Sequence, residues 1–286
     1  MQDFDRARRQ ARLEQVLARL RGDSTELLNY EDVRRKLKGS LMTSRGLQDI
    51  PIDAIVGSVG RYTDFTRSFL PRQDQDENRW VRVGMAMTDL TGVPPIEVYQ
   101  IGEVYFVMDG NHRVSVAKQL GATHIEAYVT ECHTKVPLTP DVRPEDLIVK
   151  AEYADFLEAT GLDEVRPDAD LSMTIPGRYR DLKEHISVHR YFMGVEADRE
   201  IPYQEAMAHW YDEVYLPVVD IIRKNGILKD FPDRTETDLY LWVLRHRDEL
   251  DRELAWAIRP EVAAEDLVDR FSPQFARAFR RVINWL

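Results

Sequence analysis

The stretch YFVMDGNHRVSVAKQLG at residues 105–121 constrains the fold of this chain more than any other stretch. Apolar residues lead into an Asp-Gly turn, and a helical pattern follows until Gly121. Apolar residues that run straight into a turn are typical of a buried strand, and glycine often ends a helix because it adopts a left-handed backbone without strain. The stretch therefore predicts a strand, a tight turn and a helix that begins near Asn111 or His112.

The residues of this turn suit a phosphate group. The first amides of a helix have no partner within the helix and carry partial positive charge. Gly110 allows a close approach of the backbone, and Asn111 can cap the helix. Arg113 can donate two hydrogen bonds to a phosphate, His112 can donate one or take a proton, and Asp109 can bind a hydroxyl, hold a metal ion or act as a base. Because Asp-Gly turns and Asn caps are also common without any ligand, a purely structural turn stays open as the alternative.

Strands and helices are mixed around this turn. The pair of strands at 96–100 and 104–108, joined by Ile-Gly-Glu, predicts a β-hairpin. Periodicity and Gly/Pro positions predict helices at 3–21, 30–37, 62–70 and 80–90, a strand at 124–130, and loops at 39–46 and 57–61. Residues 50–56 have the pattern of a short strand or of a strand that enters a turn. The first helix has its apolar residues at helical spacing, namely Phe4, Ala11, Leu13, Val16, Leu17 and Leu20.

The second half of the sequence has the pattern of helices alone. Three prolines within residues 134–144 predict a connector between domains. Thr235 and Asp238 are spaced as a helix-capping start. The predicted helices lie at 145–160, 178–194, 203–224, 235–256, 261–270 and 273–284. The expected fold class is α+β, with a small mixed-sheet domain and N-terminal helices, followed by an all-α C-terminal domain.

The net charge of −11 is distributed unevenly along the chain. Residues 1–150 hold 21 Lys and Arg against 22 Asp and Glu, whereas residues 151–286 hold 18 against 28. An acidic half repels the phosphate backbone, so DNA is a poor partner for it. Residues 1–50 form the one basic section, with 11 basic against 8 acidic side chains, and this excess fits either a solvated helix face or a nucleic-acid contact.

The composition indicates a protein of the cytoplasm. No apolar stretch is long enough to span a membrane, and the first ten residues lack the apolar core of a signal peptide. The single cysteine, Cys132, allows no disulfide within the chain, which suits a reducing compartment. Cys132 follows a predicted strand, and we expect it to be a small buried residue rather than a nucleophile.

Histidines and aromatic residues are dense between residues 178 and 247. His185 and His189 are four residues apart and share a helix face, which is compatible with a metal or substrate site. No third ligand is evident, so no metal site is expected. The alternative is helix packing around aromatic side chains such as Trp210 and Trp242. In a third interpretation this half closes over the phosphate site or forms a dimer interface, with Arg234 as the residue that would reach the site.

The ordered set of motifs over residues 48–131 resembles the ParB/sulfiredoxin-like superfamily. Ile50-Pro-Ile-Asp-Ala-Ile55 resembles the opening segment of that domain, and Arg61 falls near the arginine that follows it in ParB-like proteins. Pro94-Pro-Ile-Glu-Val98 resembles the strand before the central motif. Asp109-Gly-Asn-His-Arg113, with Leu120-Gly121, is similar to the central motif, which contacts nucleotide phosphates. The second half resembles an uncharacterised bacterial helical domain.

The resemblance implies a nucleotide-binding domain at 48–134, an N-terminal helical extension at 1–47 and an acidic helical domain at 145–286. Members of the superfamily include clamps that use CTP, sulfiredoxins that use ATP and a free-serine kinase that uses ADP. Asn111 stands where sulfiredoxin needs a cysteine, which argues against that reaction. His112 replaces the first arginine of the ParB pair, and the Asp-Gly-x-His-Arg form is closest to the serine kinase-like branch.

Three hypotheses follow. The first is a nucleotide-binding protein that takes ATP, ADP or CTP with Mg²⁺ and acts as a phosphotransferase on a small molecule or as a nucleotide hydrolase. Its phosphate-binding residues would be Arg61, Gly110, Asn111, His112 and Arg113, with Asp109 and His112 as catalytic groups. The second is a ParB-like DNA-binding regulator. The third is a non-catalytic scaffold. A homodimer is a possible assembly for each of them.

Overall fold

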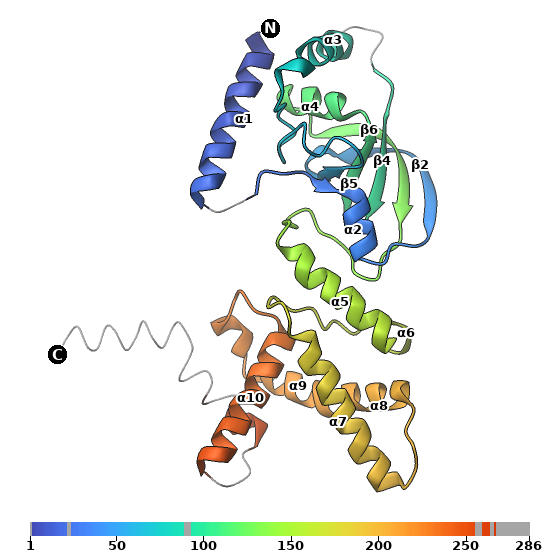
Figure 1. Ribbon diagram of the computed structural model, residues 1–286, viewed down its shortest axis with the longest axis vertical. Helices are drawn as coiled ribbons and strands as arrows, with labels where there is room; N and C mark the ends of the chain where they lie inside the picture. Colours follow the sequence, from blue (N-terminus) through green and yellow to red (C-terminus); the bar gives the residue numbers. More distant parts are fainter. Residues whose placement is uncertain (1, 22–23, 89–92, 255–258, 264–265, 267–286) are drawn as a thin grey trace, which may run out of the picture. The chain divides into compact units, whose positions relative to one another are not determined.

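The computed structural model describes residues 2–21, 24–88, 93–254, 259–263 and 266 (Figure 1). The chain divides into two compact units, Met1–Leu147 and Ile148–Leu286. The first unit contains a mixed sheet with helices around it, and the second consists of helices. The chain is therefore an α+β protein with a helical C-terminal region, as the sequence predicts. None of the helices in the described ranges is both long and apolar enough to cross a membrane.

A six-stranded sheet forms the centre of the first unit, in the order β1-β3-β5-β4-β6-β2. The β4–β5 hairpin is antiparallel, as is the β2–β6 pair, while β3–β5, β4–β6 and β1–β3 are parallel. The strands are β1 (Leu28–Asn29), β2 (Met42–Pro51), β3 (Ile55–Ser58), β4 (Ile96–Ile101), β5 (Val104–Asp109) and β6 (His124–Cys132). The parallel β3–β5 pair is central to the site, because both strands end at the same edge of the sheet.

Four α-helices accompany this sheet. α3 packs beside α4 (Figure 1), and the Trp80 indole N–H donates to Ser115 Oγ at 2.9 Å between them. The ring of Phe4 meets the edge of Trp80 at 5.8 Å, which attaches the first helix to the same unit. The helices are α1 (Gln2–Arg21), α2 (Tyr30–Lys36), α3 (Glu77–Thr88) and α4 (Asn111–Gln119), with 3-10 turns at Ile52–Ala54 and Asp74–Asp76.

The second unit packs helices around buried aromatic rings. Trp210, Tyr215 and Tyr240 are all fully buried and contact one another. A π-helical turn joins two of the helices without a break. The elements are α5 (Asp146–Thr160, which begins in the first unit), α6 (Leu162–Val165), α7 (Tyr179–Ala197), α8 (Tyr203–Trp210), the π turn Tyr211–Tyr215, α9 (Leu216–Lys224), a 3-10 turn at Ile227–Asp230 and α10 (Glu236–Leu254).

Most of the predicted elements are present. The hairpin, the strand–turn–helix of residues 104–119 and the capping start of α10 are confirmed. The Thr235 hydroxyl accepts a hydrogen bond from the Asp238 amide, and the Asp238 carboxylate accepts one from the Thr235 amide at 3.0 Å. The connector at 134–144 contains no helix or strand. Of the last two predicted helices, 273–284 lies outside the described residues and 261–270 lies mostly outside them.

Three local predictions are wrong. The predicted loop at 39–46 is largely strand, because β6 offers pairing partners as far as Cys132, and Gly46 absorbs a bulge with φ +71°. No helix forms at 62–70, where the Thr66 hydroxyl accepts from the Leu70 amide and competes with helical hydrogen bonds. Gly57 and Ser58 of the predicted loop at 57–61 belong to β3. Of the two alternatives for residues 50–56, the strand that enters a turn is the one observed, with a 3-10 turn at Ile52–Ala54.

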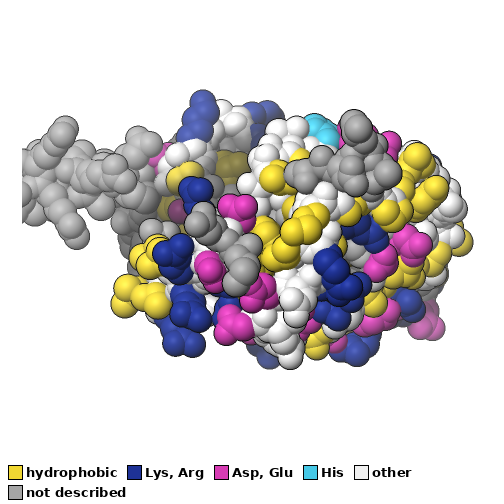
Figure 2. All heavy atoms as spheres, turned by 90° about the horizontal axis from the view of Figure 1, so that it is seen from above, with side chains coloured by type: hydrophobic (Ala, Val, Ile, Leu, Met, Phe, Trp, Pro, Cys, Tyr) yellow, Lys and Arg dark blue, Asp and Glu magenta, His cyan; other side chains and the backbone are white. Residues whose placement is uncertain are grey.

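The first helix buries fewer of its apolar residues than the pattern predicts. Phe4, Ala7 and Ala11 are buried. The second half of the same helix leaves four large apolar side chains at least half exposed, namely Leu13, Val16, Leu17 and Leu20. On the face shown in Figure 2, basic and acidic side chains are intermixed.

Candidate functional site

The turn between β5 and α4 requires glycine at position 110. Gly110 has φ +111°, in the region that L side chains avoid, and it is the N-terminal cap residue of α4. A Cβ atom at this position would lie 2.4 Å from Ile96 Cγ2 of the neighbouring strand. The close approach predicted for Gly110 is therefore present. It brings the start of α4 directly against the start of β4.

A cavity of about 380 Å³ opens at the N-terminus of α4. Its walls come from three places in the sequence: the loop after β3, the first two turns of α3, and the β5–α4 turn. The lining residues are Gly60, Arg61, Arg79, Val83, Met108, Asp109, Gly110, Asn111, His112 and Arg113. All six residues predicted to bind phosphate or to act in catalysis line this cavity. The first amides of α4 have no partner within the helix, so the start of α4 suits an anion.

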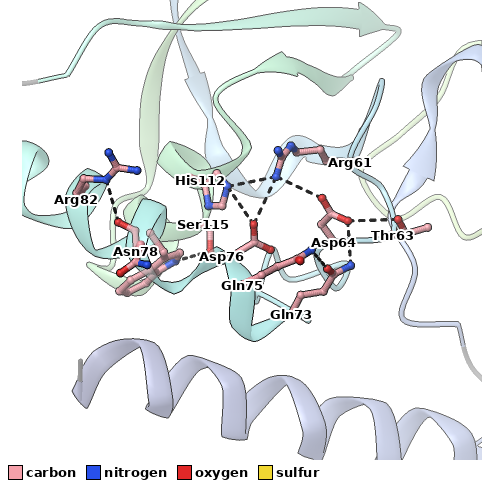
Figure 3. A network of polar contacts seen from close by, with 11 residues as sticks. Arg61, Thr63, Asp64, Gln73, Gln75, Asp76, Asn78, Arg82, His112 and Ser115 are labelled. Atoms are coloured by element: carbon pink, nitrogen blue, oxygen red, sulfur yellow. Dashed lines mark hydrogen bonds and ion pairs between the residues drawn. The ribbon is translucent and has the colours of Figure 1, made fainter.

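Arg61 enters the cavity from the loop after β3. The Ser58 hydroxyl donates to the carbonyl of Val107 and accepts from the Arg61 amide at 3.4 Å, which holds this loop to β5. The Arg61 guanidinium lies 3.4 Å from the Asp64 carboxylate and 3.5 Å from Asp76 Oδ1 (Figure 3). Both distances are long for charge-assisted hydrogen bonds, so a ligand can draw the guanidinium away from either carboxylate.

Asp76 is a buried carboxylate beside this arginine. Only 7% of the residue is exposed, and burial followed by the charge of Asp64 raises the pKa of its carboxyl group. Its Oδ1 is 3.6 Å from His112 Nε2, and its Oδ2 has no hydrogen-bond partner in the described structure. The sequence showed Asp76 only as one of several acidic residues in a polar segment, and nothing in that pattern indicates that it meets His112.

His112 is held as a neutral imidazole. The residue is 4% exposed, and burial, followed by the positive charges of Arg79 and Arg61, lowers the pKa of its ring to about 4. Phe65 contacts the ring edge-on at 5.3 Å between centroids. Its Nε2 is 3.5 Å from the Arg61 guanidinium, and its Nδ1 is buried with no partner among the described residues. At neutral pH this ring can accept or donate a hydrogen bond, but it does not carry a charge to a phosphate.

Arg79 is a cation at the cavity that sequence reasoning missed. It is exposed on the first turn of α3, and its guanidinium makes no hydrogen bond or ion pair within the described part of the chain. A cation in the first turn is unfavourable for the helix itself, since the partial charge there is also positive. The unfavourable position of this positive charge was the one signal in the sequence that could have indicated Arg79 as a binding residue. Arg82, one turn later, donates instead to the carbonyl of Asn78 at 3.1 Å (Figure 3).

Arg113 has a structural role that the sequence did not indicate. Its guanidinium donates to the carbonyls of Pro94 and Pro95 at 2.6 and 2.7 Å and pairs with the Asp109 carboxylate. Arg113 thus joins α4 to the segment that precedes β4. These contacts occupy donors that we expected to face a phosphate. Asp109 remains 61% exposed at the cavity wall despite this pair.

Asn111 does not cap the helix, contrary to the sequence prediction. Gly110 is the cap residue because its positive φ already turns the chain, and Asn111 becomes the first residue of α4. The Asn111 side chain is buried instead, and its Oδ1 has no hydrogen-bond partner within the described ranges. A buried polar atom without a partner costs free energy, about 1–3 kcal/mol, so a ligand that offers a donor here would recover part of it.

Two other predicted positions have contacts within their own units. Cys132 is buried at the end of β6, opposite Met42 of β2, as expected for a small packed residue. Arg234 donates to the Thr174 hydroxyl at 2.7 Å and lies over the Trp242 ring at 5.2 Å, so its charge is used within the helical unit. In the same unit, His185 Nδ1 lies 3.3 Å from the Tyr240 hydroxyl, and His189 Nε2 lies 2.9 Å from His209 Nδ1. The described residues contain no group of three or more side chains placed to hold a metal ion.

Comparison with known proteins gives distant structural similarity alone. No protein-family model matches the chain, and no curated protein matches it in sequence. Among solved structures, sulfiredoxin from Arabidopsis thaliana is 17% identical, covers 30% of this chain and 86% of its own, and has a TM-score of 0.24. A Pnob8-like ParB-N domain is 11% identical, covers 85% of this chain and 99% of its own, and has a TM-score of 0.22.

Proposed function

We propose that the cavity at the start of α4 binds the phosphate groups of a nucleotide, namely ATP, ADP or CTP. One observation carries this proposal: the first residues of α4, whose amides have no partner within the helix, line the same cavity as Arg61 and as Arg79, which makes no ion pair within the described residues. Helix amides and arginines are the donors that proteins use for phosphate. The cavity volume of about 380 Å³ lies within the range typical of small-molecule sites.

The charges around the cavity support a phosphate more than a carboxylate ligand. Within the described residues Arg79 makes no hydrogen bond or ion pair, and Arg61 is held only by long contacts, so both guanidinium groups are available to an anion with several oxygens. Each hydrogen bond from a charged donor contributes about 1.5–3 kcal/mol. A terminal phosphate can accept from both arginines and from the helix amides at the same time. The negative charges of Asp76 and Asp109 oppose a dense anion, which favours a phosphate chain that carries a cation with it.

Magnesium fits this arrangement as a companion of the nucleotide. Mg²⁺ keeps several of its waters and uses one or two protein carboxylates together with phosphate oxygens. Asp109 is the exposed carboxylate at the cavity wall, and Asn111 Oδ1 is an acceptor without a partner in the described structure. These two groups would contact the hydrated ion through its waters. The ion would neutralise the part of the phosphate charge that Arg61 and Arg79 do not compensate.

Phosphoryl transfer to a small hydroxyl compound, or to water, is the reaction we propose for this site. Asp109 and His112 are the groups that could accept the proton of the attacking hydroxyl. The low pKa of His112 makes it a weak base, so its contribution is to accept a hydrogen bond and orient the hydroxyl. Asp109 is the stronger candidate for the base, because it stands at the exposed side of the cavity, where a second substrate can enter.

Calorimetric titration of the full chain with ATP, ADP and CTP, each with and without Mg²⁺, tests the binding. We expect Arg79→Ala to weaken nucleotide binding about tenfold or more, since it removes a charged donor. Arg82→Ala is the matched control, because Arg82 lies on the same helix but not at the cavity. Absence of binding to the unmodified protein, or equal weakening in both variants, would contradict the proposal.

A separate assay tests the reaction. Conversion of the nucleotide to the product that is one phosphate shorter is followed with and without a panel of small hydroxyl compounds, because transfer to such a compound releases no free phosphate. We expect Asp109→Asn to reduce turnover about a hundredfold, within the range for a lost general base, while the nucleotide remains bound. Binding without turnover under all conditions would leave nucleotide binding intact and exclude the transfer reaction.

A further inference from the structure

The second half of α7 carries a row of large apolar side chains that face solvent. Each is between 50% and 67% exposed, and they lie at positions i, i+3, i+4 and i+7 of the helix, which share one face. Leu182 and Ile186 lie on the opposite face, where they are buried and attach α7 to the rest of its unit. The exposed row, termed the apolar stripe, consists of Val188, Tyr191, Phe192 and Val195.

The apolar stripe is large enough to mark a contact surface. A Tyr or Phe side chain brings about 150–250 Å² of surface, and Tyr191 and Phe192 are 67% and 63% exposed. Together with the two valines, the stripe offers on the order of 400 Å², a size at which apolar patches are often functional. The two rings contact each other edge to face, with 5.4 Å between their centroids. Because each ring already restricts the other, little side-chain freedom is lost when a partner covers them.

Two cavities flank the apolar stripe. Val188 and Phe192 line the larger one, of about 630 Å³, which lies between α7, the α8–α9 junction and α10. Tyr191 and Val195 line the smaller one, of about 410 Å³, which α7 forms with the segment that follows it as far as Ile201. The stripe is therefore a ridge with a hollow on each side. Helices pack by placing ridges of side chains beside such grooves, so this surface suits another helix.

The apolar stripe is symmetric in the order of its residues. Read in either direction, it gives valine, two aromatic rings and valine. In an antiparallel pair of α7 helices, Val188 is level with Val195 of the second copy, and the four rings meet around the two-fold axis. The two larger cavities then face each other on one side of the rings, which leaves space for the Phe192 ring of each copy. A two-fold pair needs a surface of this kind, because one patch must be complementary to itself.

The charges beside the apolar stripe permit the approach of a second copy. Residues 151–286 hold 18 Lys and Arg against 28 Asp and Glu, so two such units repel each other on average. The two cavities differ from this average. Three arginines and three carboxylates line the larger cavity, and two arginines and one carboxylate line the smaller one. Two copies can therefore meet at this face without an excess of negative charge, whereas a strongly basic partner would find no complementary charge there.

Charged residues at the two ends of the stripe favour one direction of pairing. Glu184 lies one turn before Val188, and Arg199 lies four residues after Val195, just beyond the end of α7. In the antiparallel pair each Glu184 is level with Arg199 of the second copy, and symmetry repeats this contact. Arg199 pairs with Glu205 of its own copy, but 52% of its side chain remains exposed to a second carboxylate. A parallel two-fold pair would place Glu184 against Glu184, which is unfavourable.

We propose that the apolar stripe is the interface of a homodimer, in which two copies of this chain pack their α7 helices antiparallel. The four aromatic rings bury one another around the two-fold axis, and the Glu184–Arg199 contacts flank them. The stripe supplies about half of the 800 Å² per partner that is typical of a stable complex, so the dimer exchanges with the monomer. The interface does not involve the phosphate cavity, and the failure of either proposal leaves the other unaffected.

Sedimentation velocity of the full chain, at concentrations from about 1 to 300 μM, measures the association. We expect a reversible equilibrium between monomer and dimer with a dissociation constant on the order of 10 μM, because the interface is smaller than that of most stable complexes. A chain that stays monomeric over the whole range would overturn the proposal.

Three glutamate substitutions locate the interface. Phe192→Glu places two carboxylates near the two-fold axis, and we expect the dissociation constant to rise about a hundredfold or more. Ile148→Glu is the matched control, because Ile148 is a 54% exposed apolar residue on α5 of the same unit. Leu17→Glu changes the other exposed apolar row, on α1, where Leu17 is 51% exposed. We expect neither control to weaken the dimer. Equal weakening by Ile148→Glu, or a dimer that only Leu17→Glu disrupts, would overturn the proposal.

A charge exchange tests the antiparallel direction. We expect Glu184→Arg and Arg199→Glu each to raise the dissociation constant about threefold, since each sets like charges level with one another at both ends of the interface. The double variant restores opposite charges, and we expect it to dimerise as the unmodified chain does. A double variant that is weakened as much as the two single changes combined would exclude the antiparallel arrangement and overturn the proposal.

Discussion

The two units of this protein place their buried polar groups differently. In the first unit five of the residues that line the cavity, Asp109 to Arg113, follow one another at one short turn, and the loop after β3 and the start of α3 complete its walls. In the second unit the cavity is assembled from α7, the α8–α9 junction and α10, and no more than two consecutive residues of the chain line it at any point. A site built on a contiguous turn depends on the backbone at one residue, whereas a site built between helices depends on side-chain packing and on caps that hold the helices in place.

The largest effect that would test this comparison is expected at Gly110. Substitution by alanine places a Cβ atom 2.4 Å from Ile96 Cγ2 and also strains a backbone with φ +111°. We expect Gly110→Ala to lower the free energy of unfolding of the first unit by about 4 kcal/mol. Gly121→Ala is the control, because φ is +77° there but the space is open, so only about 1 kcal/mol should be lost. Urea unfolding measures both values, and equal losses would show that the close approach to Ile96 does not matter.

A somewhat smaller effect is expected at Asp238 in the second unit. This buried carboxylate accepts hydrogen bonds from the amide and hydroxyl of Thr174 at 3.1 and 2.8 Å and from the amide of Thr235 at 3.0 Å. Asp238→Ala removes the buried acceptor of all these hydrogen bonds, and we expect a loss of about 3 kcal/mol. Asn29→Ala removes a simple cap of α2 in the first unit and should cost about 1 kcal/mol. Amide hydrogen exchange at Thr174 and Asp32 reports each loss locally, and an Asp238 effect no larger than that of Asn29 would contradict the prediction.

The smallest effect is the pH dependence that His112 confers on the first unit. The pKa of its ring is about 4 in the folded state and lies near 6.5 in the unfolded chain, so the unfolded state binds more protons between these values. Stability is therefore lost as pH falls below about 6.5, by about 2 kcal/mol between pH 7 and pH 5. Asp76 has the opposite effect on stability. Because its pKa is raised in the folded state, the folded state binds a proton more readily than the unfolded chain, so this group favours folding as the pH falls.

Unfolding of a His112→Gln variant at both pH values isolates this contribution. We expect the difference in stability between pH 7 and pH 5 to shrink by about 2 kcal/mol in this variant. His124→Gln is the control, because His124 lies exposed at the start of β6. An unchanged pH dependence in His112→Gln would mean that the imidazole is not held neutral by its surroundings.

Much of the first unit could be predicted from local pattern. The hairpin and the strand–turn–helix of residues 104–119 follow from short-range rules of alternation, turn residues and helix stops, and all six candidate residues line one cavity. The failures share a physical cause. Residues 39–46 became strand because β6, about 85 residues away in sequence, supplied hydrogen-bond partners. Residues 62–70 lost a helix because the Thr66 hydroxyl competed for the backbone.

The sequence by itself determined the α+β class, the elements that meet at the turn and the need for glycine at position 110, because these depend on backbone preferences over a few neighbouring residues. Only the tertiary structure decided the electrostatics. It placed Asp76 and Arg79 beside His112. It also directed the Arg113 guanidinium to the carbonyls of Pro94 and Pro95, and it buried the Trp210 indole. Burial and charge–charge distances depend on residues far apart in the chain, and no local pattern of residue types contains them.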